Sequence, residues 1–271
     1  MASAADAPRF DLQSHSTRSD GELSPANVVA AAARAGVEVL ALSDHDSVDG
    51  IPEAASAARE HGIRLVPATE VSALHEGERD LHILGYLIDH ESPALRDLGF
   101  NVDESELDVR RARGDSIGRP HLAQAVVRHP DNAPRLRRER LETGSDVLEA
   151  YLTPGARAFS PRSGPTVAEA IELIHAAGGV AVWAHPFWDF DTPQEVLDAI
   201  DRFKGFGIDG VEAFYVTHTK EQTELAAAKA RALDLLTTGS ADFHGPSHPH
   251  FHAFRAFDLY GLQPVLGPIG E

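Results

Sequence analysis

The stretch from Ser24 to Leu42 reads SPANVVAAAARAGVEVLAL, and it predicts one complete helix followed by one strand. Ser24 is a good N-cap, Pro25 suits the first helical position, and Gly36 is a stop signal. The apolar run from Val37 to Leu42 is typical of a buried strand. A short glycine turn between a helix and a buried strand indicates an α/β fold.

The same alternation of strands and helices continues along the chain with short turns. The expected strands are Arg9–His15, Val37–Leu42, Ile63–Ala68, Leu81–Ile88, Val180–Ala184, Gly210–Val216 and Leu235–Gly239. The expected helices are Ser24–Ala35, Ile51–His61, Thr166–Ala177, Pro193–Phe206 and Lys220–Leu233. This order predicts a mainly parallel sheet, and seven strands suit a barrel.

Residues 92–162 interrupt this order, because they carry few strand signals and many charges. We interpret them as a mostly helical insertion that caps the substrate site. The barrel is then formed by residues 9–91 and 163–247, and residues 248–271 are an irregular tail that packs on it. The arginines of Arg135–Arg140 alternate with Leu and Glu, a pattern more typical of a solvated helix face than of an RNA-binding track.

The composition limits the kinds of partner and chemistry. The chain has 271 residues, with 24 Lys and Arg against 42 Asp and Glu, so its formal net charge is −18. Its 15 histidines occur without any cysteine, which excludes disulfides, thiolate catalysis and iron–sulfur clusters. So acidic a surface disfavours duplex DNA and anionic membranes. The mixture suits a divalent metal site, although scattered surface histidines would give the same composition.

The sequence also bears on where the protein resides. It contains no run near 18 apolar residues, so we expect no membrane-spanning segment. The beginning of the chain, MASAADAP, lacks the basic start and apolar core of a secretory signal. We therefore expect a cytoplasmic protein.

Metal-competent side chains lie at or near the end of nearly every predicted strand, except that His82 lies near the start of the fourth. They are His15 with Asp20, the run Asp44-His45-Asp46, Glu70, His82, His185, Glu212, and Asp242 with His244. The carboxyl ends of the strands form the ligand-binding face of α/β sheets and barrels. One such residue is usually structural, but recurrence at successive strand ends favours a multinuclear Mn, Fe or Zn site.

These strand-end segments, taken in order, resemble the PHP family, which is named for polymerase and histidinol phosphatase. The matching segments are DLQSHSTRSDGELSP (11–25), LALSDHDSVDGIPEA (40–54), GIRLVPATEVSA (62–73), LHILGYLID (81–89), AHP (184–186) and GSADFHGP (239–246). Three further segments are similar to the branch of stand-alone nucleotide phosphoesterases: GRPHLAQAVV (118–127), YLTPGARAFSPR (151–162) and GVEAFYVTHT (210–219). The resemblance implies a distorted (βα)7 barrel with a small helical insertion.

The resemblance also implies an activity. The expected reaction is hydrolysis of phosphomonoesters of small nucleotides, such as AMP or a pAp-like nucleoside 3′,5′-bisphosphate, by a metal-bound hydroxide. The expected cofactors are two or three divalent ions, Mn, Fe or Zn, with Mg as a further option. A 5′-3′ exonuclease on short RNA, a histidinol phosphatase and a non-catalytic metal-binding module are the alternatives. The expected partner is a small phosphorylated substrate or short RNA, with no membrane and no duplex DNA.

By position, the resemblance implies three groups of metal ligands. The groups are Gln13, His15, Glu70 and Asp242 for the first metal, Glu70, His82 and His185 for the second, and Asp20, His45 and His244 for the third. Gln13 departs from the family, whose motif has a histidine there. A neutral amide oxygen is a weaker ligand than imidazole for a borderline metal, so the first site could favour a harder ion or stand empty.

Four residues are candidates for contact with the substrate. Arg119 and His121 resemble the family's R-x-H element, and a guanidinium fork suits phosphate geometry. His121, or another histidine of the site, could protonate the leaving group. Arg162 and His218 are candidates for a second phosphate or the ribose. An ordinary surface arginine is the alternative for Arg119, and a structural histidine for His218.

Overall fold

The computed structural model describes residues 8–76, 79–88, 137–138, 140, 143, 146, 164–190 and 192–271, with only the backbone of Arg79. The chain divides into two compact units, Met1–Gly99 with Gly164–Glu271, and Phe100–Ser163. Most of the predicted insertion, residues 92–162, lies outside the described residues, so its helical character and the predicted domain boundaries stay predictions.

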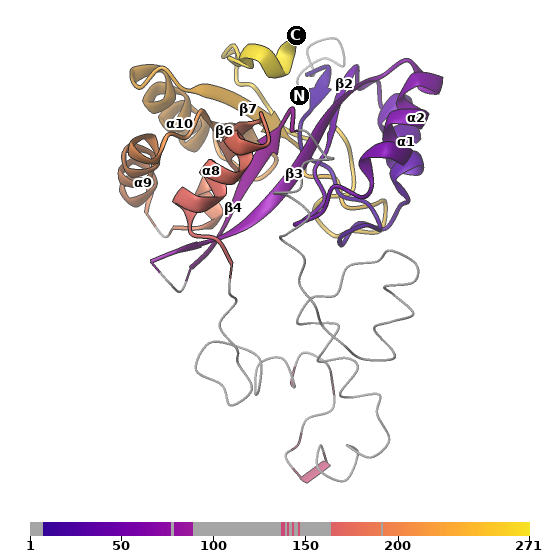
Figure 1. The fold of residues 1–271 in the computed structure, drawn as a ribbon, viewed down its shortest axis with the longest axis horizontal. Helices are drawn as coiled ribbons and strands as arrows, with labels where there is room; N and C mark the ends of the chain where they lie inside the picture. Colours follow the sequence, from indigo (N-terminus) through magenta and orange to yellow (C-terminus); the bar gives the residue numbers. More distant parts are fainter. Residues whose placement is uncertain are drawn as a thin grey trace. The chain divides into compact units, whose positions relative to one another are not determined.

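Seven strands form one sheet in which the spatial order follows the chain order (Figure 1). The strands are β1 (Phe10–Asp11), β2 (Val39–Leu42), β3 (Arg64–His75), β4 (Arg79–Tyr86), β5 (Val180–Trp183), β6 (Gly210–Tyr215) and β7 (Leu236–Ser240). The sheet curls until its two edges meet. The amide of Leu12 donates to the carbonyl of Gly239 at 3.2 Å, and that of His15 to Phe243 at 2.9 Å. The expected distorted barrel is therefore confirmed.

Among the residues that the structure describes, five α-helices cover the outside of this sheet (Figure 1). They are α1 (Pro25–Arg34), α2 (Ile51–His61), α8 (Val167–Ala176), α9 (Pro193–Phe206) and α10 (Lys220–Ala232). Local chemistry sets where they begin: Ser24 caps α1, and Thr166, Thr192 and Thr219 form capping boxes that satisfy free backbone amides. Helices α2 and α9 have the predicted bounds, and the other three differ by one or two residues.

Strand direction is where the structure departs from the prediction. Four of the strand pairs are parallel as expected, but β4 runs antiparallel to both β3 and β5. Strand β3 is also seven residues longer at its end than the predicted Ile63–Ala68, because β4 pairs with it from Ala68 to His75. The reversal brings the first half of β4, with His82, to the end of the barrel where the parallel strands finish.

The first strand is shorter than predicted. Only Phe10–Asp11 of the expected strand Arg9–His15 pairs continuously with β2. Beyond it, Ser14 forms an isolated bridge to Phe243. The polar residues of this segment thus lie at the seam where the two edges of the sheet meet.

The core consists of apolar side chains on both faces of the sheet. One layer lies between β2 and helices α1 and α2, and a second between β3–β5 and helices α8 and α9. A further cluster includes Leu12, Val66, Leu84 and Val182. Within it, the buried hydroxyl of Tyr86 donates to the carbonyl of Leu12 at 2.9 Å, linking β4 to the seam. None of the helices described is long and apolar enough to cross a bilayer.

Candidate metal centre

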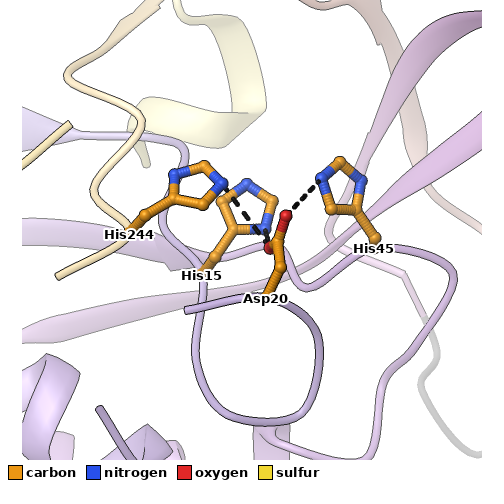
Figure 2. A group of neighbouring side chains, drawn as sticks. All are labelled: His15, Asp20, His45 and His244. Carbon is orange, nitrogen blue, oxygen red and sulfur yellow. Dashed lines mark ion pairs between the residues drawn. The ribbon is translucent and has the colours of Figure 1, made fainter. Parts of the chain in front are cut away.

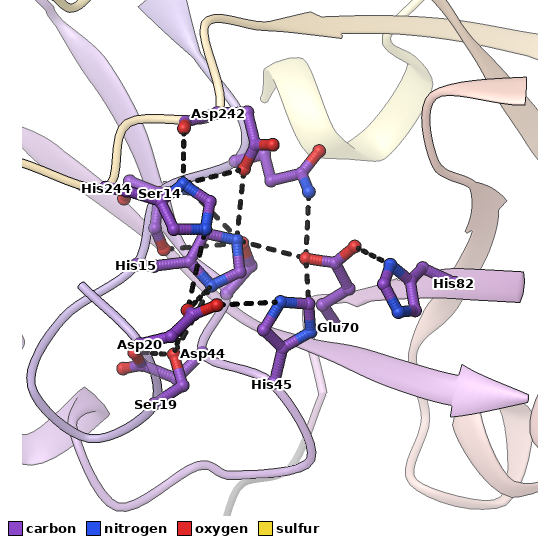
Figure 3. A network of polar contacts seen from close by, with 12 residues as sticks. Ser14, His15, Ser19, Asp20, Asp44, His45, Glu70, His82, Asp242 and His244 are labelled. Carbon is purple, nitrogen blue, oxygen red and sulfur yellow. Dashed lines mark hydrogen bonds and ion pairs between the residues drawn. The ribbon is translucent and has the colours of Figure 1, made fainter. Parts of the chain in front are cut away.

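The carboxylate of Glu70 lies at the middle of a polar cluster at the carboxyl ends of the parallel strands (Figure 3). Its side chain is 0% exposed. Its Oε2 atom lies 2.8 Å from Nε2 of Gln13 and 3.0 Å from Nε2 of His15. Nδ1 of His45 is 3.7 Å from the same oxygen. One buried oxygen thus faces side chains that come from the segments after β1 and β2.

The other oxygen of Glu70 faces the opposite part of the barrel. Its Oε1 atom lies 2.9 Å from Nδ1 of His82 and 3.0 Å from Nε2 of His185. The two imidazoles approach each other, with Nδ1 of His82 3.4 Å from Nε2 of His185. The two oxygens of Glu70 therefore face different imidazoles, and the bridging role expected for this residue stays a prediction.

Asp242 and His15 face each other as a buried ion pair whose geometry is not that of a hydrogen bond. Oδ1 of Asp242 lies 3.1 Å from Nε2 of His15, and both atoms are buried without a hydrogen-bond partner. The other oxygen of Asp242 accepts a hydrogen bond from the hydroxyl of Tyr215 at 2.7 Å. Buried polar atoms are rarely left unpartnered. A cation between these two atoms would satisfy both, so the residues fit a metal.

A third group surrounds Asp20, on the loop after β1 (Figure 2). Its carboxylate lies 3.6 Å from Nε2 of His45, and 3.5 Å from both Nε2 of His244 and Nδ1 of His15. These separations are longer than hydrogen bonds. Asp20, His15, His45 and His244 each offer one ligand atom, and those atoms all lie within 4.8 Å of one another.

The structure therefore brings together all nine residues that the resemblance marks as ligands. We call them the rim cluster: Gln13, His15, Asp20, His45, Glu70, His82, His185, Asp242 and His244. Two more groups have ligand atoms within 4.8 Å, His45 with Glu70 and His82, and His15 with Glu70 and Asp242. The groups overlap, because His15, His45 and Glu70 each belong to two of the three. Whether each residue binds a metal stays a prediction.

Carboxylates and imidazoles within the rim cluster shift each other's pKa. Burial raises the pKa of Glu70, but His45 and His82 outweigh burial and hold that pKa well below its usual range. Burial lowers the pKa of His15, but Asp242 and Glu70 outweigh it and raise that pKa well above its usual range. Ligating imidazoles must be neutral. A bound divalent cation would displace these protons and supply the positive charge itself.

The backbone is strained beside the cluster. His185 has a φ of 29° and Asp242 a φ of 52°, in the left-handed region that residues other than glycine seldom adopt. Each follows the end of a strand, β5 for His185 and β7 for Asp242. Such conformations cost about 1–3 kcal/mol and persist only where the surroundings fix them. At both positions the strain accompanies a side chain that points into the rim cluster.

The PHP domain profile matches residues 11–152, slightly more than half of the chain. This chain belongs to the PHP domain family. The resemblance inferred from the ordered segments is thereby confirmed.

Several relatives of this PHP protein are named as enzymes that cleave phosphoesters. A 5′-3′ exoribonuclease of Haemophilus influenzae is 35% identical, over 88% of this chain and 90% of the relative. A 3′,5′-nucleoside bisphosphate phosphatase of Chromobacterium violaceum is 32% identical, over 96% and 94%. A Bifidobacterium adolescentis crystal structure, described as a metal-dependent phosphoesterase, is 26% identical over 90% of this chain and 91% of that one, with a TM-score of 0.68. This chain is likewise a metal-dependent phosphoesterase.

Two carboxylates next to the rim cluster, Asp44 and Asp11, accept hydrogen bonds from the loops that carry its residues. Neither was assigned a role from the sequence. Asp44 accepts hydrogen bonds from the amide of Ser16 at 2.7 Å, the hydroxyl of Ser16 at 2.8 Å and the hydroxyl of Ser19 at 2.7 Å. Although Asp44 is metal-competent, its oxygens are therefore occupied by the loop that carries Asp20. Asp11 similarly accepts from the amides of Ala241 at 2.9 Å and Arg255 at 2.7 Å.

Glu212 on β6 is a second residue whose role the sequence left open. It is fully buried and accepts hydrogen bonds from the backbone amide of His185 at 2.9 Å and the hydroxyl of Ser240 at 2.6 Å. Burial raises the pKa of Glu212 to about 8. Glu212 therefore fixes the strained peptide of a ligand candidate. The available signal was a single carboxylate inside the apolar strand sequence GVEAFY.

The predicted substrate residues are only partly within the described chain. Arg119, His121 and Arg162 lie outside the described residues, so their roles stay predictions. His218 is buried after β6, and its Nδ1 donates to the carbonyl of Ala213 at 3.1 Å. Burial lowers the pKa of His218 to about 4, so the ring is neutral at pH 7. Its Nε2 is buried without a hydrogen-bond partner, and its substrate role also stays a prediction.

Proposed function

We propose that this PHP protein hydrolyses phosphate monoesters of small nucleotides, with AMP and pAp-like nucleoside 3′,5′-bisphosphates as its substrates. The observation that carries the proposal is the placement of Glu70. Its Oε2 atom lies 3.0 Å from His15, and its Oε1 atom lies 2.9 Å from His82 and 3.0 Å from His185. A phosphomonoester is dianionic. Its hydrolysis needs a nucleophile and strong charge neutralisation at one place, which clustered divalent cations suit.

The rim cluster is the set of residues that would hold the cations. Imidazole and carboxylate ligands without thiolates suit two or three ions of Mn, Fe or Zn, with Mg as a further option. When bound, such ions lower the pKa of coordinated water and bind phosphate oxygens. They would also make the site locally positive, so the net charge of −18 does not exclude an anionic substrate.

Other residues orient the rim cluster or would meet the substrate. Tyr215 holds the carboxylate of Asp242, and Glu212 holds the peptide of His185. We assign to Arg119 the remaining phosphate oxygens, because its guanidinium can donate two parallel hydrogen bonds. His121 is the candidate to protonate the leaving alkoxide. Arg162 and His218 are candidates for a second phosphate or the ribose.

A second candidate function is 5′-3′ hydrolysis of short RNA. The observation that favours it is the 35% identity to the exoribonuclease of Haemophilus influenzae over 88% of this chain. The same cations would serve both reactions, and the difference lies in whether the site accepts a chain beyond the first nucleotide. The acidic surface limits such a substrate to short RNA and disfavours duplexes.

The test compares three substrates with one metal-depleted preparation. The protein is reloaded with Mn, Fe or Zn and given AMP, pAp or a short 5′-phosphorylated RNA. We expect phosphate release from AMP or pAp, and nucleotide release from RNA would instead support the second candidate. Glu70→Gln should lower the rate by more than about 100-fold, since loss of outer hydrogen-bond partners alone costs about 10- to 100-fold.

Glu224→Gln is the matched control for that variant. Glu224 lies on the exposed face of α10 and pairs with Lys220 at 3.6 Å. Its loss should leave the rate unchanged. A metal-loaded protein that releases product from none of the three substrates would refute both candidate functions.

A further inference from the structure

One large aromatic side chain beside the rim cluster is exposed to solvent. Trp188 ends a short 3-10 helix, Pro186–Trp188, that begins directly after His185, and it is 56% exposed. We propose that its indole ring is the surface on which the nucleobase of the substrate stacks. This inference rests on the proposed function, because it specifies which part of a nucleotide is recognised outside the phosphate centre.

The indole is held in one orientation by its own polar atom. Its Nε1 donates to the hydroxyl of Thr217 at 2.7 Å, and Thr217 belongs to the loop after β6. The hydrogen-bonding need of the ring is thereby met within the protein. The rest of the exposed ring is apolar carbon and can gain free energy only by contact with another apolar or aromatic surface. A ring held in place also loses little entropy when it binds a ligand.

Two neighbours of Trp188 connect it to the rim cluster. Its ring centroid lies 6.4 Å from that of His185 and 6.3 Å from that of Tyr215. His185 contacts Glu70 at 3.0 Å, and Tyr215 donates to Asp242 at 2.7 Å. Glu70 is thus separated from the indole by the side chain of His185, and Asp242 by the side chain of Tyr215. In a nucleotide, a single ribose separates the phosphate from the base, so a phosphate at the rim cluster places the base near Trp188.

The exposed ring fits a base better than a protein surface. The other large apolar side chains exposed among the described residues are Phe206 and Val265. Phe206 precedes β6, at the opposite end of that strand from the rim cluster, so it does not extend an apolar patch around Trp188. Protein-binding patches are usually contiguous. Base stacking needs one aromatic face and no charge, which also suits an acidic protein.

The test compares a substrate that has a base with one that lacks it. Trp188→Ala should lower kcat/KM for AMP by about 5- to 140-fold, which corresponds to the usual contribution of one stacked base. It should leave kcat/KM for ribose 5-phosphate unchanged. Trp188→Phe should restore most of the activity with AMP, because a benzene ring still stacks. Phe206→Ala is the control for loss of an exposed aromatic side chain. It should change kcat/KM for neither AMP nor ribose 5-phosphate.

Tryptophan fluorescence provides a readout that does not depend on turnover. The chain has two tryptophans, and Trp183 is only 1% exposed. AMP, but not ribose 5-phosphate, should therefore quench the emission of Trp188 in the Zn²⁺-loaded protein, and Trp188→Phe should abolish the quenching.

Two outcomes separate this inference from the proposed function. Equal losses of kcat/KM for both substrates, or quenching that survives in Trp188→Phe, would overturn base stacking while leaving phosphatase activity intact. Quenching by AMP without hydrolysis of AMP or pAp would support stacking and refute the proposed function. Absence of both would refute both.

Discussion

Gln13 decides how the first group of ligands behaves. Its Nε2 donates to Glu70 at 2.8 Å, and its Oε1 lies 3.4 Å from the hydroxyl of Ser240. In this orientation the amide nitrogen, which has no lone pair for a cation, is the atom that faces Glu70. Half a turn of the carboxamide would direct its oxygen to a cation and let its nitrogen donate to Ser240. Metal binding at the first group therefore competes with an existing hydrogen bond.

The first prediction follows from this competition. Gln13→His should bind Zn²⁺ at the first group at least about 10-fold more tightly, because imidazole is the better ligand and changes to a ligand's surroundings alone alter affinity about 10- to 100-fold. Calorimetric titration and the metal content after dialysis measure the change. Gln194→His, at an exposed position of α9, controls for adventitious histidine binding. Unchanged affinity in Gln13→His would show that residue 13 does not face the metal.

The protonation of buried Glu212 makes the stability of the fold depend on pH. Burial raises its pKa from 4.5 to about 8, so the folded protein binds a proton that the unfolded chain releases between these pH values. Its contribution to stability is complete below pH 4.5 and is lost as pH rises towards about 8. Each unit of pKa difference corresponds to about 1.4 kcal/mol.

The second prediction concerns Glu212→Gln in the metal-free protein. Glutamine can keep both hydrogen bonds, accepting from the amide of His185 and donating to Ser240, but it does not ionise. The stability of the wild type should therefore fall relative to Glu212→Gln as pH rises from 5 to 8. Urea denaturation at several pH values measures the difference, with Glu224→Gln as the control. A difference that is constant with pH would contradict the raised pKa.

At the scale of elements, the contact between β6 and β7 positions Asp242. The register of this pair shifts between Glu212 and Phe214, and there the two strands approach closely. A Cβ atom on Gly239 would lie 2.6 Å from the carbonyl oxygen of Phe214, which belongs to the backbone and cannot swing away. The absence of a side chain at Gly239 is therefore a condition for this register.

The third prediction is that Gly239→Ala separates the two strands. It should destabilise the fold by about 1–3 kcal/mol, the usual cost of overpacking a core. Gly205→Ala in helix α9 is the matched control, because a Cβ there meets nothing within 4 Å and should stabilise the helix by about 0.5–1 kcal/mol. Thermal unfolding of both variants distinguishes them. Equal effects of the two substitutions would show that the strands adjust without cost.

At the scale of the whole molecule, the rim cluster brings together residues that follow the first and the last strand of the barrel. His15 follows β1 and Asp242 follows β7, yet the two side chains face each other at 3.1 Å. A cation bound between them would close the barrel at the seam that the backbone closes with few hydrogen bonds. Metal binding should therefore stabilise the fold, as any ligand of the native state does.

The fourth prediction measures this stabilisation. At a free metal concentration about 100 times the Kd, the fold should gain about 2.7 kcal/mol for one site. The midpoint of thermal unfolding should rise with Zn²⁺ or Mn²⁺ and return to the metal-free value with a chelator. The increase should be smaller in Asp242→Asn than in the wild type. A midpoint that does not respond to divalent ions would show that the rim cluster is a purely structural polar network.

The sequence by itself determined the kind of elements, their order and the identity of the rim residues. Helix bounds such as Pro193–Phe206 were predictable because the capping residue Thr192 and the stop residue Gly207 act on the neighbouring backbone. Only the tertiary structure decided the reversed direction of β4, the inward face of Glu212 and the exposure of Trp188. These depend on segments far apart in the chain, such as Glu70 and His185, which are 115 residues apart. Which oxygen faces which imidazole is set when the barrel closes, and no local preference encodes it.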